Sequence, residues 1–172
     1  MISTPGTLYK LMILWFLDSV DFPLSNAVIS NYILEKGYTD YFKIQTTFSE
    51  LEEAGLITST SSHKTTYYTI TEDGKNTLEC FHHEISRDIK TEIKDYLKTH
   101  FNEIVEMLSI SSDYTKIRKN DYLVTCKFTE RDSVLASIEL SVSNEESAQL
   151  VCKNWAEKNS EIYSYLIKTL LN

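Results

Sequence analysis

Glycine, proline and cysteine are scarce in this chain. Its 172 residues include four glycines, two prolines and three cysteines. Four glycines leave little room for a glycine-rich phosphate loop, and neither a G-x-S-x-G elbow nor an H-E-x-x-H motif is present. Cys80, Cys126 and Cys152 are odd in number and form no C-x-x-C pair, which argues against a disulfide framework and a zinc ribbon. We therefore expect no enzyme, no cofactor and no metal.

Long apolar runs are also absent. The longest extends from Leu11 to Leu17, whereas a membrane helix requires roughly 20 apolar residues. No basic segment with a cleavage site precedes this run. Apolar residues make up 42% of the chain, enough for one large or two small cores. We expect a soluble, cytoplasmic protein with no membrane partner.

Positive charge is sparse in the first half of the chain. The whole chain has a net charge of −8, from 17 basic and 25 acidic residues. Residues 1–84 contain five lysines, no arginine and eleven acidic residues, which is a net charge of −6. Residues 85–172 account for the other −2. Such a chain is not an obvious ligand for a phosphate backbone, so nucleic-acid binding would depend on a few placed lysines.

Three helices and a hairpin are predicted in the first 70 residues. The first helix occupies residues 7–18. The second is capped by Ser25 and ends at Gly37, and the third is capped by Thr39 or Asp40 and ends at Gly55. Two β-rich stretches, 56–57 and 67–70, then flank a polar segment. Residues 71–102 form one or two linking helices, with Thr71 and Ser86 as caps.

This order of elements is that of a winged helix-turn-helix. In that fold the third helix enters the major groove and the hairpin, or wing, contacts the backbone. The candidate DNA contacts are the polar side chains on the outer side of the third helix and at the hairpin tip: Lys43, Gln45, Thr46, Ser49, Ser62, His63 and Lys64.

A period of two replaces the helical pattern after about residue 104. Residues 122–128 and 134–142 alternate in polarity, and a weaker strand spans Leu108, Ile110 and Tyr114. Ser143 to Glu146 match a capping box that opens a long helix with Ala148, Val151, Trp155, Ile162, Leu166 and Leu170 on one stripe. We expect an α+β chain with a winged helix-turn-helix domain (1–84), a linking helix (85–103) and a βββα domain (104–172), in which the long helix covers a three-stranded antiparallel sheet.

Two stretches of the chain carry a family resemblance. They read LYKLMILWFLDSVDFPLSNAVISNYILEKGYTDYFKIQTTFSELEEAGLI, followed by HKTTYYTITEDGKNTLECF, and LSVSNEESAQLVCKNWAEKNSEIYSYLIKTLL. Together they resemble a bacterial family of winged-helix proteins of unknown function. More distantly, residues 7–81 are similar to the DNA-binding half of PadR-type and MarR-type transcriptional regulators. Those families bind DNA as homodimers, and the resemblance implies the same here.

The first helix also points to a dimer. Leu11 to Leu17 are apolar on every side of the helix, so a partner subunit or the C-terminal domain is expected to cover the second side. Tyr163, Tyr165, Ile167 and Leu171 likewise lie off the main stripe of the last helix.

From the sequence we expect a homodimeric DNA-binding transcriptional regulator. The alternative is a winged-helix scaffold that binds protein instead of DNA. The C-terminal sheet could in addition bind a small-molecule effector on its second face, which is lined by Leu123, Thr125, Lys127, Leu135, Ser137 and Glu139. His82, His83 and Glu84 beside Cys80 are interpreted as a solvated helix end and not as a metal site.

Overall fold

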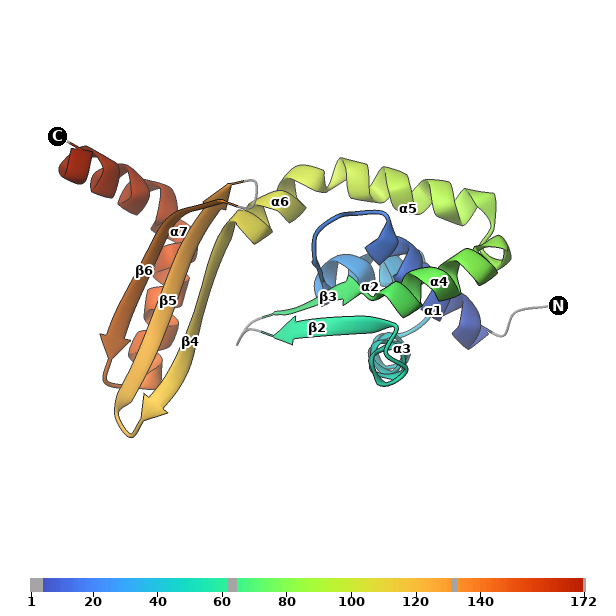
Figure 1. Cartoon of the computed structure of the whole chain (residues 1–172), viewed down its shortest axis with the longest axis horizontal. Coiled ribbons are helices and arrows are strands. Elements are labelled where there is room, and N and C mark those ends of the chain that lie inside the picture. The colour runs from blue at the N-terminus through green and yellow to red at the C-terminus, as the bar shows by residue number, and fades with distance from the viewer. Residues whose placement is uncertain (1–4, 62–64, 131–132, 172) are drawn as a thin grey trace. The chain divides into compact units, whose positions relative to one another are not determined.

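The computed structural model describes residues 5–61, 65–130 and 133–171 of an α+β chain. The chain divides into two compact units, residues 1–101 and 102–172, and each has its own three-stranded antiparallel sheet (Figure 1). Over the described ranges, no helix has the length and apolar character needed to cross a membrane.

The first unit contains most of the helices. In chain order its elements are α1 (Pro5–Asp18), β1 (Leu24–Ser25), α2 (Asn26–Glu35), α3 (Tyr41–Glu53), β2 (Ile57–Ser61), β3 (Thr66–Ile70), α4 (Glu72–Phe81), the short 3-10 helix η1 (His82–Glu84) and α5 (Arg87–Thr99). The strands are ordered β1-β3-β2, with Ile57 opposite Ile70 and Leu24 opposite Tyr68. The sequence pattern did not predict β1, because two residues are too few to show a period.

Local capping signals set the helix boundaries. The side chain of Ser25 accepts a hydrogen bond from the backbone N–H of Val28 (3.3 Å), and Asp40 accepts one from Lys43 (2.9 Å), so Asp40 and not Thr39 caps α3. Thr71 and Ser86 cap α4 and α5 as predicted. After α2 and α3 the backbone turns through Gly37 and Gly55, with φ of +69° and +71°, a conformation that favours glycine.

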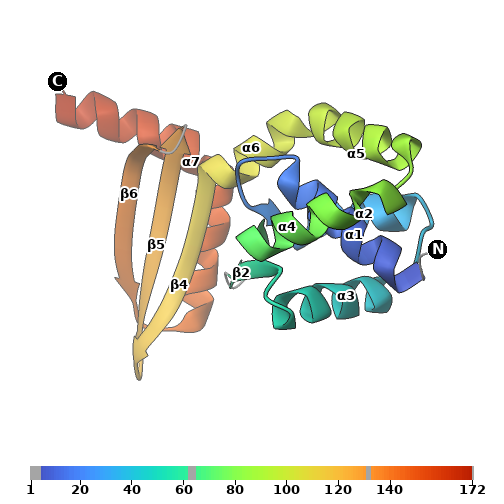
Figure 2. The same cartoon turned by 45° about the vertical axis from the view of Figure 1, so that its right-hand side comes forward.

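Helix α1 is the centre of the first unit. Leu11 to Leu14, Phe16 and Leu17 are buried, and α1 contacts α3, α4, α5, η1 and β3 of the same unit (Figure 2). The prediction that a partner subunit or the C-terminal domain covers its second side is therefore wrong. Helix α5, predicted as a linker, is part of this core: Ile93 and Leu97 are buried. α1 is apolar on every side because it is buried within its own unit. This pattern therefore gives no evidence for or against a dimer.

The second unit consists of a helix, a sheet and a long covering helix. Its elements are α6 (Phe101–Ser109), β4 (Ile110–Arg118), β5 (Asp121–Glu130), β6 (Ser133–Val142) and α7 (Glu145–Leu171), with strand order β4-β5-β6. Val124 and Cys126 of the sheet pack against Ala148, Cys152 and Trp155 of α7. The Trp155 indole N–H donates to the carbonyl of Lys127 (3.3 Å) and so ties the helix to the central strand.

Three local predictions for this unit need correction. Leu108 belongs to α6 and not to a strand, because Phe101, Ile104, Val105 and Leu108 continue a helical spacing to Ser109. Asn144, not Ser143, caps α7: its side-chain oxygen accepts from the backbone N–H of Ser147 (2.7 Å).

The third correction concerns the end of α7. The buried stripe consists of Ala148, Cys152, Trp155 and Asn159, whereas Leu170, predicted on the stripe, is 76% exposed. Both views show the last turns of α7 running past the end of the sheet (Figures 1 and 2), so the sheet is too short to cover them.

Gly74 in α4 occupies a site that admits no side chain. A Cβ atom at this position would overlap the carbonyl oxygen of Leu56 and lie 2.8 Å from Cγ1 of Ile70. The Leu56 carbonyl cannot move freely, because it accepts the backbone N–H of Thr71 (3.0 Å). We predict that Gly74→Ala lowers the free energy of unfolding by about 1 to 3 kcal/mol, measured by urea unfolding. Gly6→Ala in α1 is the control, since nothing lies within 4 Å of its added Cβ, and equal destabilisation by both variants would contradict the packing at Gly74.

The three thiols differ in their surroundings. Cys80 is exposed, whereas Cys126 and Cys152 are buried in the second unit. Burial, and to a lesser extent the nearby Cys152, raises the pKa of Cys126 to about 11, so its thiolate is rare at neutral pH. We predict that one thiol per chain reacts rapidly with a disulfide reagent in the folded protein and that all three react in denaturant. A Cys80→Ser variant should lose the rapid phase; its persistence would contradict the burial of the other two.

Candidate nucleic-acid interface

The outer side of α3 is exposed and carries the predicted contact residues. Ile44, Phe48 and Leu51 are buried, which turns the opposite side of the helix to solvent. Lys43, Thr46 and Ser49 are exposed there, as predicted. Phe42, at the second position of the helix, is 82% exposed and lies edge-on to the ring of Tyr41. Tyr41 is itself 54% exposed, so the start of α3 presents two adjacent aromatic side chains to solvent.

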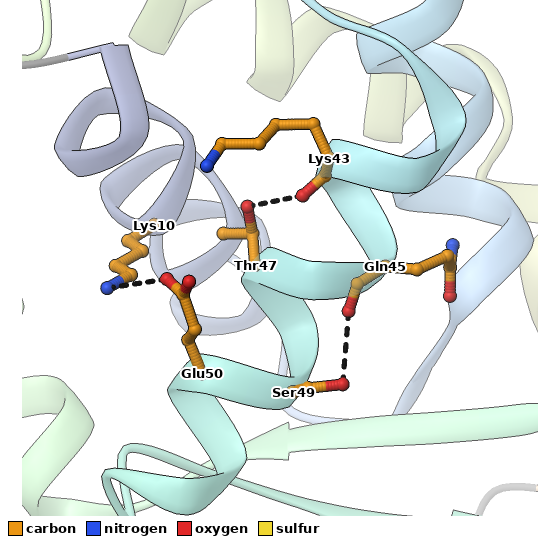
Figure 3. Close-up of polar contacts among 6 residues, drawn as sticks. All are labelled: Lys10, Lys43, Gln45, Thr47, Ser49 and Glu50. Carbon is orange, nitrogen blue, oxygen red and sulfur yellow. Dashed lines mark hydrogen bonds and ion pairs between the residues drawn. The ribbon is translucent and has the colours of Figure 1, made fainter.

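The hydroxyl groups on α3 point back to the helix. Thr46 donates to the carbonyl of Phe42 (2.9 Å), Thr47 to that of Lys43 (2.7 Å) and Ser49 to that of Gln45 (3.2 Å); Figure 3 draws the last two. A hydroxyl that donates in this way retains lone pairs that can accept a further hydrogen bond. The outer face of α3 therefore presents acceptors at Thr46 and Ser49 and a cation at Lys43.

Gln45 is held by the neighbouring helix. Its side-chain oxygen accepts from Nδ2 of Asn26 (2.9 Å), and its Nε2 donates to Oδ1 of Asn26 (3.1 Å). Oδ1 of Asn26 also accepts the hydroxyl of Ser30 (2.8 Å). This reciprocal amide pair joins α3 to the first turn of α2. Gln45 thus positions α3, and its amide is already occupied by a bidentate partner.

The charges on α3 are segregated along its axis. Lys43 is the one charged residue among residues 41–49, and Glu50, Glu52 and Glu53 follow in the last turn. Two of these carboxylates have partners. Glu50 forms an ion pair with Lys10 of α1 (2.9 Å), and Glu52 accepts the hydroxyl of Ser59 (2.5 Å). The acidic end of α3 is therefore partly neutralised by its own unit.

Lysine side chains also set the ionisation of Glu50. The hydrogen bond and charge of Lys10 lower the pKa of Glu50 below its ordinary value, against the opposing effect of desolvation, and Lys43 makes the smallest contribution. Figure 3 shows Lys10, Lys43 and Glu50 on the same side of α3, with Gln45 on the opposite side. Lys10 is thus the main cation acting on Glu50.

The predicted wing contacts Ser62, His63 and Lys64 lie outside the described residues. The strands that flank them are paired up to Ser61 and Thr66, whose hydroxyl oxygens are 3.0 Å apart. The predicted contacts of this segment therefore remain predictions.

Other surfaces offer weaker candidates. A shallow cavity of about 330 Å³ in the first unit is lined by acidic, basic and apolar side chains: Trp15, Asp18, Lys75, Leu78, Glu79 and His82. Over residues 5–61, 65–130 and 133–171, no group of three or more His, Cys, Asp or Glu side chains is arranged to hold a metal ion. The uncovered face of the second sheet is mixed in polarity, since Leu123 and Thr125 are half-buried and Lys127 is exposed.

Two features of this surface of α3 could not be predicted from the sequence. The Lys10–Glu50 pair and the Asn26–Gln45 pair join residues on different helices, and nothing local in the sequence marks them. The position of Phe42, in contrast, was predictable, because the helical spacing places it on the outer side of α3. It is absent from the predicted DNA contacts because these were limited to polar side chains.

The Lys10–Glu50 pair gives a pH-dependent prediction. In Lys10→Met the pKa of Glu50 should rise toward its ordinary value, which an NMR titration of the carboxyl carbon can measure. Because the folded-state pKa of Glu50 is lowered, its contribution to stability is present above the ordinary pKa of a glutamate and is lost as the pH falls through the lowered one. Lys36→Met is the control, since Lys36 pairs with Glu92 instead; an unchanged Glu50 titration in Lys10→Met would contradict the pairing.

Comparison with known proteins identifies a family. No curated protein and no solved structure matches the chain. One family model, described as a domain of unknown function (DUF4364), matches residues 9–170. Since the match includes both units and nearly every residue, the chain belongs to the DUF4364 family.

Proposed function

We propose that this protein is a homodimeric DNA-binding transcriptional regulator, in which α3 enters the major groove and the β2–β3 hairpin lies on the backbone. The observation that carries the proposal is the outer face of residues 41–49, which is exposed, combines Phe42 with polar side chains and carries Lys43 as its one charge. The proposal gives this face the role of reading base edges, which a recognition helix does with its N-terminal residues.

The arrangement of elements supports this assignment. The order α1, β1, α2, α3, β2, β3 with strand order β1-β3-β2 is the one expected of a winged helix-turn-helix. The N-terminus of α3 carries the positive end of the helix dipole, which favours approach to phosphates. The carboxylates lie in the last turn, where a helix that inserts by its N-terminal end keeps them away from DNA.

The side chains on this face suit direct contact with bases. Lys43 can donate to guanine or to a phosphate, and the hydroxyl oxygens of Thr46 and Ser49 can accept from cytosine or adenine. The ring of Phe42 can lie against a thymine methyl group. Gln45 then supports α3 from behind through its pair with Asn26.

The charge of the first domain limits how such binding works. Residues 1–84 have a net charge of −6, so long-range attraction to DNA is absent. Each lysine that contacts a phosphate contributes about −0.9 to the slope of log K against log salt. With few lysines available, the salt dependence should be modest and specificity should depend on contacts to the bases.

A protein partner is the second candidate. Exposed aromatic residues are enriched at the centres of protein interfaces, and Tyr41 and Phe42 are both more than half exposed. A scaffold that binds protein through this end of α3 would use the same aromatic pair and would not need Lys43. A small-molecule effector on the second unit is compatible with either function.

Replacement of Lys43 separates the two functions. After a genome-wide pull-down has mapped a binding site, Lys43→Ala should weaken binding to that site and reduce the salt slope by about one unit per protomer. Lys64→Ala on the hairpin should act in the same direction. Fluorescence anisotropy across a salt series measures both effects.

Lys36→Ala is the matched control, because Lys36 is an exposed lysine of the same unit that is engaged with Glu92 at 3.1 Å. Its affinity and salt slope should equal those of the wild type. Unchanged binding in both Lys43→Ala and Lys64→Ala would exclude the proposed geometry. A pull-down that enriches no DNA and one dominant protein would favour the scaffold.

A further inference from the structure

The two edges of the second sheet differ in how well they resist pairing. The β4 edge carries Asp113, Lys116 and Arg118, and its register shifts between Lys116 and Arg118. Charges and bulges of this kind protect an edge strand from pairing with another chain. The β6 edge is ten residues long, contains a single charge, Glu139, and has no proline. Its own register shift lies near its start, at Leu135, so the strand is regular from Ala136 onward. In the parts of the chain that the structure describes, no strand pairs with the outer side of β6.

The apolar side chains of β6 are also left uncovered. α7 packs mainly against β4 and β5 and less against β6. Leu140 lies on the face that α7 covers, because it shares its strand parity with Ile138, which packs on the core. The register shift at Leu135 places Val134 opposite Thr129, on the other face. Leu140 is nevertheless 44% exposed. An edge with a single charge and an exposed apolar side chain therefore coincide on one strand.

We propose that β6 pairs antiparallel with β6 of a second copy of this chain, so that the two three-stranded sheets become one continuous sheet. The pair is related by a twofold axis perpendicular to the sheet, which is the symmetry of an isologous dimer. This inference names the surface that forms the proposed homodimer; it rests on that part of the proposed function and not on DNA binding.

The sequence of β6 is complementary to itself in one register. In an antiparallel pair about a twofold axis, centring the axis on Ile138 places like faces together. Within the regular part of β6, the covered face then pairs Ile138 with Ile138 and Ala136 with Leu140. The other face pairs Ser137 with Glu139. Every pair on the covered face is apolar, and no charge faces a like charge, which favours a second copy over an unrelated peptide.

The same register also explains how the part of β6 that α7 leaves exposed becomes covered. The perpendicular twofold axis places both α7 helices on one face of the joined sheet, with the two β6 strands between them. The exposed side chain of Leu140 in each copy then lies against Ala136 of the other copy. Pairing thus removes from water the apolar side chain that α7 leaves open, which is the driving force for the association.

The decisive experiment measures mass in solution by light scattering and sedimentation. The wild type should be a dimer, and Leu140→Lys, which places an ammonium group against the partner's Ala136, should weaken association by at least about 100-fold. Ile117→Lys is the matched control. Ile117 is 56% exposed on the opposite edge strand, β4, and the variant should remain dimeric.

Cysteine cross-linking tests the register and does not depend on the lysine variant folding well. In a Cys80→Ser background, Ile138→Cys places two thiols across the axis, at a Cα separation that a disulfide can span. Mild oxidation should give a covalent dimer in most of the protein. Ile117→Cys in the same background should stay a single chain.

Three outcomes would overturn the inference. They are a monomeric wild type, a Leu140→Lys variant that stays dimeric and folded by circular dichroism, and an Ile138→Cys variant that does not cross-link. A dimer abolished by Leu170→Lys but not by Leu140→Lys would place the interface on the end of α7 instead. A dimer that cross-links through Ile138→Cys but binds no DNA would support the β6 pairing and refute DNA binding. A monomer that binds DNA would support DNA binding and refute the β6 pairing.

Discussion

The burial of α1 on all sides is the constraint on which the first unit depends. A helix without a polar face must be surrounded, and α3, α4, α5 and β3 supply the surrounding surfaces from the same chain. α3 contributes by turning Ile44, Phe48 and Leu51 inward. Because those three side chains set the rotation of α3 about its axis, they also determine that Phe42, Lys43 and Thr46 face outward. The composition of the candidate interface follows from the packing of the core.

The same packing modifies the electrostatics of the unit. A net charge of −6 over residues 1–84 implies repulsion of DNA if the charges are spread evenly. They are not, since Lys10 on α1 reaches Glu50 and Ser59 on β2 reaches Glu52. Two of the carboxylates of α3 are thereby engaged at one end, and Lys43 is the one charged side chain near the other. A few such contacts change which charged groups the surface presents, while the net charge stays the same.

The second unit shows how unequal cover leaves a sheet with one open side. α7 is bound to the central strand by the core around Val124, Cys126 and Trp155 and by the indole hydrogen bond to Lys127. A single helix is narrower than a three-stranded sheet, so the outer strand β6 retains exposed apolar side chains. Each edge strand has one bulge, but β4 carries three charged residues and β6 only one. The asymmetry of the two edges, and not the composition of the unit as a whole, distinguishes the side available to a partner.

Local chemistry explains what could be predicted from the sequence and what could not. The caps Ser25, Thr71 and Ser86, the turns at Gly37 and Gly55, and the alternating strands were predictable, because each depends on residues that are near one another in the chain. The sequence also determined which side of α3 is apolar. Only the tertiary structure decided that α1 is enclosed by its own unit, that Glu50 meets Lys10 and Gln45 meets Asn26, and that α7 leaves β6 uncovered. These features join segments far apart in the chain, and a periodic pattern shows that a face must be covered without showing which segment covers it.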